Sequence, residues 1–186
     1  MRSLASTRLG RVSWLASTLA MLAIISSVNP SAALADQQHG VRGAVFVQTN
    51  DIFGNAILAY ARSNGGGLTL GGRYPTSGLG GTEPGAPTDP LSSQGSLTYD
   101  GPQHLLFAVN AGSDSVSVFE VRRTQLRLTQ VVASGGQFPS SVAVHHDLVY
   151  VLNDGGDGSI NGYRVDGDSL TPLAGSERSL GLGRSF

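Results

Sequence analysis

From about residue 41 onward the chain is a series of short runs of branched and aromatic residues separated by Gly, Asp and Asn. Such runs, bounded by residues that favour turns, are typical of β-strands. This part of the chain shows no helical period of apolar residues. The pattern therefore predicts an all-β fold of short strands joined by tight turns.

Three of these segments align as a repeat. In each one an apolar run leads to an asparagine, a polar turn follows, and a second run reaches an aromatic residue nine or ten positions later. A third run begins at a leucine seven or eight positions further on. The three asparagines are Asn50, Asn110 and Asn153, so the last two are 43 residues apart. A period of about 40–45 residues with several strands per unit is typical of β-propeller blades.

The repeat predicts a β-propeller of four-stranded antiparallel blades, with units at about 41–77, 95–134 and 138–175 and a long loop at 78–94. The first unit lacks the innermost strand that precedes the other two. A β-sandwich with coincidental spacing is the alternative, because sandwiches also place strands every eight to twelve residues.

About three blades leave the predicted ring incomplete, since propellers have roughly four to eight. An open stack would expose strand edges and an apolar blade face. We therefore expect the chain to be the N-terminal portion of a longer propeller, or to close the ring with missing blades or by self-association.

Residues 1–35 have the order of a secretory signal peptide. A start with three arginines precedes an apolar stretch of about 15 residues, too short for the roughly 20 of a membrane span. The small residues that follow predict cleavage between Ala35 and Asp36. We expect a secreted or periplasmic protein, 36–186, with no stable membrane span after cleavage; a buried helix or an uncleaved anchor is the alternative.

Three segments carry a resemblance to a known family. They are Ser93–Asp100 (SQGSLTYD), Leu105–Val121 (LLFAVNAGSDSVSVFEV) and Phe138–Asn153 (FPSSVAVHHDLVYVLN). These segments resemble the lactonase-type seven-bladed β-propellers, a family typified by 6-phosphogluconolactonase and similar to carboxy-muconate cyclases and YVTN-repeat surface proteins. The resemblance covers about 41–180. It implies a propeller fold and hydrolysis of a lactone or related sugar-acid ester, with such a lactone as the small-molecule partner.

Composition excludes several chemistries. The chain has no cysteine and its 12 basic residues are all arginines, which excludes disulfides, thiol nucleophiles and lysine Schiff bases. The formal net charge of −1 gives no reason to expect a nucleic-acid partner. No metal or other cofactor is predicted, because the loop at 154–158 lacks the alternating acids of a calcium-binding loop.

Individual residues do not identify a catalytic site, and the catalytic residues are left unassigned. The three repeat asparagines are interpreted as scaffold residues that close turns. His145, His146 and Asp147 are interpreted as a hairpin turn, with His104 in the corresponding turn one unit earlier. Arginines near the third strands are expected on solvated outer edges. They are Arg62, Arg122, Arg123, Arg127 and Arg164.

Three hypotheses about function remain open at this point. The first is a lactone hydrolase, which needs a base to activate water and a cation beside the developing oxyanion. The second is a non-catalytic binding or surface-display propeller. The third is a truncated product without activity of its own.

Overall fold

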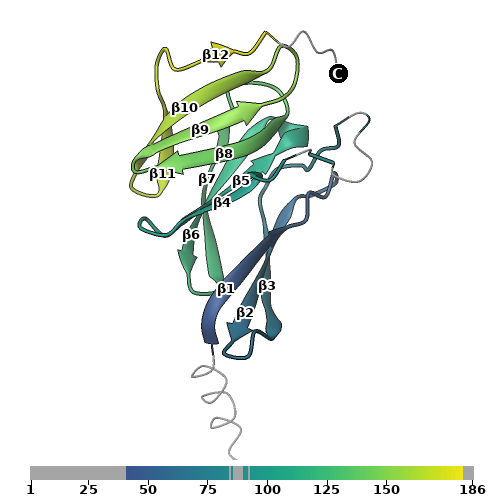
Figure 1. Cartoon of the computed structure of the whole chain (residues 1–186), viewed down its shortest axis with the longest axis vertical. Coiled ribbons are helices and arrows are strands. Elements are labelled where there is room, and N and C mark those ends of the chain that lie inside the picture. Colours follow the sequence, from purple (N-terminus) through teal and green to yellow (C-terminus); the bar gives the residue numbers. More distant parts are fainter. Residues whose placement is uncertain (1–40, 84, 86–89, 92, 182–186) are drawn as a thin grey trace, which may run out of the picture.

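The structure, a computed structural model, describes residues 41–83, 85, 90–91 and 93–181. These residues form three antiparallel sheets that follow one another along the chain (Figure 1). We call them the first sheet (β1–β3), the second sheet (β4–β7) and the third sheet (β8–β12). The strands are β1 Val41–Gln48, β2 Ala56–Ser63, β3 Leu68–Pro75, β4 Leu97–Asp100, β5 Leu105–Asn110, β6 Ser115–Arg122, β7 Gln125–Ala133, β8 Pro139–His145, β9 Leu148–Asn153, β10 Ser159–Asp166, β11 Ser169–Pro172 and β12 Arg178–Ser179.

The all-β prediction is confirmed for the described residues, where the one helical element is the 3₁₀ turn Ala111–Ser113. With the exception of β12, strands of one sheet that are consecutive in sequence are neighbours in that sheet, because short connections join them. The third unit, predicted at 138–175, contains the four strands β8–β11, and the third sheet has a fifth strand beyond that unit. There Ser176 turns the chain back and its Oγ accepts a hydrogen bond from Gly162 N at 2.9 Å, which brings β12 alongside β10. A two-residue strand is too short to leave a pattern in the sequence.

The second sheet lies between the other two, and every residue of its strand β5 is buried. Alternate side chains of a strand point to opposite faces. Phe107 therefore joins the apolar core shared with the third sheet, while Leu106 and Ala108 join the core shared with the first sheet. We call these two contacts the first interface (first and second sheets) and the second interface (second and third sheets).

The two interfaces are alike at one edge and different at the other. At one edge β7 contacts both β3 and β11. At the opposite edge β8 packs against β4 and β5, which closes the second interface. Among the described residues β1 pairs with β2 alone, so no strand in the place of β8 closes the first interface.

The predicted signal peptide, with its cleavage position between Ala35 and Asp36, lies outside the described residues. Within the described part of the chain, no helix is long and apolar enough to cross a membrane.

Candidate functional site

A pocket of about 500 Å³ opens at the first interface, beside the edge of β1. Its apolar wall consists of Ala44, Phe46, Leu97, Leu106 and Val121. Its polar side chains are those of Tyr99, His104 and Arg123. We call it the aromatic pocket. Its volume lies in the range of small-molecule sites, which combine apolar walls with a few polar groups.

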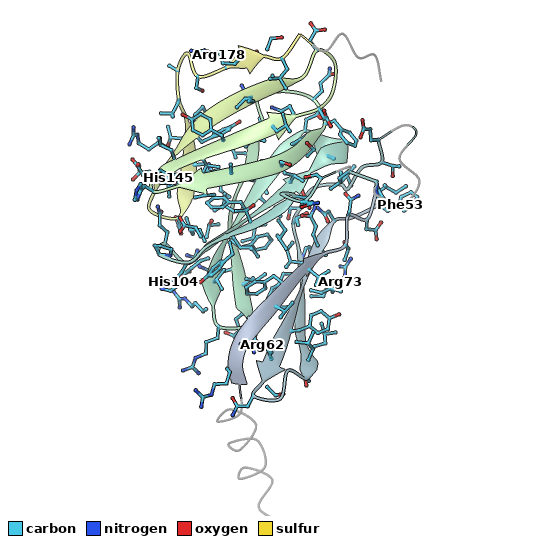
Figure 2. The ribbon with its side chains drawn as sticks, viewed as in Figure 1. Phe53, Arg62, Arg73, His104, His145 and Arg178 are labelled. Carbon is cyan, nitrogen blue, oxygen red and sulfur yellow. The ribbon has the colours of Figure 1, made fainter. Side chains whose placement is uncertain are left out.

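Tyr99 and His104 form a hydrogen-bonded pair in the aromatic pocket. Tyr99 Oη lies 3.2 Å from His104 Nδ1, and the ring of Tyr99 is tilted by 52° against that of Phe46, with 6.2 Å between the ring centroids. His104 belongs to the turn between β4 and β5, and its carbonyl oxygen accepts a hydrogen bond from Val121 N at 2.8 Å. Figure 2 shows His104 on the side of the molecule where the first and second sheets meet. The turn therefore holds the imidazole at the pocket.

Arg123 occupies an unusual backbone position. It begins the two-residue turn between β6 and β7 with a φ of 60°. The matching turn of the third sheet begins with Gly167, whose φ is 61°. A left-handed conformation costs a residue with a Cβ roughly 1–2 kcal/mol, and glycine usually occupies such positions. Tyr74 Oη fixes this turn by donating to Thr124 O at 3.2 Å. Arg123 thus presents a cation at a position that disfavours arginine.

A second pocket, of about 690 Å³, adjoins the first and shares Ala44 and Arg123 with it. We call it the arginine pocket, because Arg42 and Arg122 line it as well, beside Gly43 and the polar residues Thr124 and Gln125. A Cβ on Gly43 would come within 3.4 Å of Arg62 Nη2, so the guanidinium of Arg62 lies over this glycine. Figure 2 shows Arg62 at the lower end of β2.

Carboxylates neutralise part of this positive charge. Glu120 accepts hydrogen bonds from Arg122 at 2.8 Å and from Arg127 at 2.7 Å, and these bonds lower the pKa of its carboxyl group. Arg127 also pairs with Asp168 at 3.0 Å. This set of two arginines and two acids is neutral as a whole.

The repeat asparagines lie at the opposite end of the sheets, and they do not meet in one site. Asn110 Oδ1 accepts a hydrogen bond from Asn55 Nδ2 at 3.0 Å, and Asn110 Nδ2 donates to Ser117 Oγ at 2.8 Å. Asn50 has a φ of 50° and donates to Gly81 O at 2.7 Å. Asn153 is fully buried, and its Oδ1 has no hydrogen-bond partner. Asn55, the partner of Asn110, was not among the residues singled out from the sequence.

Figure 2 shows His145, at the β8–β9 turn, away from His104, and Gln103 Nε2 donates to His146 O at 2.8 Å between the two turns. The rings of His145 and His146 meet edge to face at 4.2 Å, and Asp147 pairs with Arg164 on β10. In the described ranges no three His, Asp or Glu residues are grouped as metal ligands. These residues thus lie in a hairpin turn and carry an exposed ion pair.

Comparison with known proteins shows the fold alone. No family model and no curated protein matches the sequence. A solved protein of unknown function from Desulfotomaculum acetoxidans matches with a TM-score of 0.52 and 15% identity, over 76% of this chain and 43% of that one. A protein from Bacteroides uniformis, provisionally named a 6-phosphogluconolactonase, matches with a TM-score of 0.37 and 13% identity, over 70% and 52%. The chain therefore spans about half or less of the solved proteins it matches.

The structure brings together residues that the sequence left apart. From the sequence, His104 is interpreted as a turn residue and Arg123 as an arginine on a solvated outer edge, while Tyr99 is not singled out. They come from three places in the chain and converge because β4, β5 and β6 are adjacent in one sheet. One local signal was available, namely an arginine where the matching turn of the third sheet has glycine.

Proposed function

We propose that this chain is part of an exported β-propeller that binds a small sugar acid or its lactone in the aromatic pocket. The observation that carries the proposal is the combination of aromatic faces with Tyr99, His104 and Arg123 around one opening of about 500 Å³. The C–H face of a sugar ring packs on an aromatic ring, while hydroxyl and carboxyl groups bond to the polar rim. Arg123 then pairs with the carboxylate or donates to the lactone carbonyl.

Hydrolysis of the lactone is a second candidate, favoured by the presence of a base and a cation in the same pocket. When His104 Nδ1–H donates to Tyr99 Oη, Nε2 is free to take a proton from water. The hydroxide attacks the lactone carbonyl carbon, and Arg123 donates to the oxyanion that forms. As the ring C–O bond breaks, His104 returns the proton to the leaving alkoxide. The lining of the pocket includes no carboxylate, and His104 is exposed to water, so binding has the stronger support.

Titration calorimetry of the purified chain with gluconate tests the binding. Arg123→Gly is the sharpest variant, because glycine suits the turn and removes only the cation. We expect Arg123→Gly to weaken gluconate binding about tenfold or more, equivalent to about 1.4 kcal/mol or more. Arg164→Gln, which alters an arginine on the third sheet, is the matched control and is expected to bind as the parent chain does. Equal affinity of Arg123→Gly and the parent chain would contradict the proposal.

Lactone opening distinguishes the second candidate from binding alone. We expect the parent chain to accelerate the hydrolysis of gluconolactone above the rate in buffer, and His104→Asn to abolish this acceleration. Asparagine tolerates the left-handed φ of 56° at position 104. If the parent chain does not raise the rate of gluconolactone hydrolysis above the rate in buffer, hydrolysis of this lactone is excluded and binding alone remains.

The propeller assignment is supported by the repeated strand order and by the outward face of the first sheet. Val47, Leu68 and Leu70 lie on that face and are 45, 52 and 55% exposed. Further blades of the same protein or a second copy would cover them. Light scattering during size-exclusion chromatography tests whether a second copy of the chain covers this face. A mass above the monomer that falls in Leu70→Ser is expected, and a monomer at every concentration would contradict self-association.

A further inference from the structure

Positive charge is concentrated around the arginine pocket beyond what its carboxylates balance. Arg42, Arg62 and Arg123 make no ion pair with any residue that the structure describes. The remaining cation of the pocket, Arg122, is already neutralised through Glu120. Two of these unpaired guanidinium groups, those of Arg42 and Arg123, line the arginine pocket, and the third, that of Arg62, lies over Gly43 at its wall, in a chain whose formal net charge is −1.

Repulsion among these groups gives no stability to the fold. Like charges at close range disfavour each other, although salt screens them at the surface. The conformation of Arg123 adds backbone strain to this repulsion. A ligand with more than one negative charge would relieve the repulsion, and each guanidinium can hold a carboxylate through two parallel hydrogen bonds.

The two pockets adjoin, because Arg123 and Ala44 line both of them, and we call the two together the groove. A sugar chain with one ring against Phe46 and Tyr99 therefore has the arginine pocket beside it. The side chains of Thr124 and Gln125 there offer neutral hydrogen bonds suited to sugar hydroxyl groups.

We propose that the groove binds an acidic oligosaccharide of at least two uronate rings, with one ring in the aromatic pocket and the next carboxylate in the arginine pocket. The proposal rests on the proposed function and extends it from one ring to a chain. Carboxylate and sulfate groups on a sugar have the same chemistry toward arginine, and a uronate is the simpler probe.

A nucleic acid fits the observations less well. Nucleic-acid-binding domains usually carry a basic stripe over a whole face and a high net charge. Elsewhere in the described chain arginines are engaged: Arg164 with Asp147, Arg178 with backbone carbonyls and Arg73 with Gly54 O. Arg73 and Arg178 have no acidic partner either, but they lie apart from each other and from Arg62 (Figure 2), so among the described residues the unpaired arginines are grouped at the arginine pocket.

Calorimetric titrations with galacturonate and with trigalacturonate test the proposal at 50 and 200 mM NaCl. We expect the trimer to bind about tenfold more tightly than the monomer at low salt, and this advantage to shrink at high salt as ionic contacts are screened. Arg42→Gln should remove most of the trimer advantage and leave monomer binding unchanged. Arg164→Gln should change neither.

The outcomes separate this proposal from the proposed function. Equal affinities for monomer and trimer would overturn the oligosaccharide and leave the single-ring site intact. Binding of neither sugar would overturn both. Tighter binding of neutral maltotriose, or of a short oligothymidylate, than of trigalacturonate would overturn the assignment of the ligand class.

Discussion

The two interfaces of the second sheet have the same strand order and different contents. The second interface is closed by β8 and filled with apolar side chains, among them Phe107, Val149 and Tyr163. The first interface has a smaller apolar core, a buried amide network at one end and the open groove at the other. The proposed ligand site lies at the interface that departs from the repeat.

The closed interface is expected to carry more of the stability. Phe107 is fully buried there, whereas Phe46 lines the groove and is half-buried. We expect Phe107→Ala to lower the free energy of unfolding by about 3–5 kcal/mol and Phe46→Ala by about 1–2 kcal/mol. Urea denaturation measures both. Phe53→Ala, at a side chain that is 89% exposed, is the control and should change stability by less than about 0.5 kcal/mol. Equal losses of unfolding free energy in Phe107→Ala and Phe46→Ala would show that the two interfaces contribute equally to stability.

The next largest expected difference in stability between the two interfaces comes from the hydrogen-bonded side chains of Asn55 and Asn110. Asn110→Ala removes two buried hydrogen bonds at the first interface, those to Asn55 and Ser117, although Asn55 still donates to Val109 O and Ser117 to Thr76 O. We expect a loss of about 2 kcal/mol, because each buried hydrogen bond contributes about 1 kcal/mol. Asn153→Ala, at the matching position, also removes an oxygen that already lacks a partner, so its loss should be about 1 kcal/mol. Thermal unfolding would contradict this difference if Asn153→Ala proved the more damaging change.

Tyr163, at the second interface, makes the stability of the fold depend on pH in the alkaline range. Its hydroxyl donates to Ala133 O at 2.7 Å, and burial raises the pKa of Tyr163 to about 12. Between pH 10 and 12 the unfolded chain loses this phenolic proton while the folded chain keeps it. Stability should therefore fall across that range by at most about 1.4 kcal/mol per pH unit from this group.

Tyr163→Phe is expected to cost about 1 kcal/mol at pH 7, since Ala133 O loses its donor. The same variant should show a flatter decline above pH 10. Urea denaturation at pH 7, 10 and 11.5 measures both effects. A decline that is as steep in Tyr163→Phe as in the parent chain would assign the alkaline sensitivity to other groups.

The smallest expected effect concerns the turn at the groove. Arg123→Gly relieves a strained φ but makes the unfolded chain more flexible, and these effects oppose each other. We expect a small gain in stability, of at most about 1 kcal/mol, because the relief of strain exceeds the cost of the added flexibility. A loss above 2 kcal/mol by thermal unfolding would show that Arg123 holds the turn together, and would weaken its assignment to ligand binding.

The strand content could be predicted from the sequence because the repeat places an asparagine, an aromatic residue and a leucine at regular spacing. The turns around His104 and Gly167 could also be predicted, since local turn chemistry determines them. The groove could not be predicted from the sequence. It depends on which strand edges stay open and on how β1 packs against β4, and both are determined by the tertiary structure. Strand β12 was missed because a two-residue strand has no period.

A sugar acid that binds at the first interface should leave the second interface unperturbed. Backbone amide NMR spectra recorded during a titration with galacturonate show which of the two interfaces responds. We expect chemical-shift changes in β1, around Tyr99 and His104, and in the turn at Arg123, with β9 and β10 unaffected. Changes centred on the third sheet, or no changes at millimolar galacturonate, would contradict binding at the first interface.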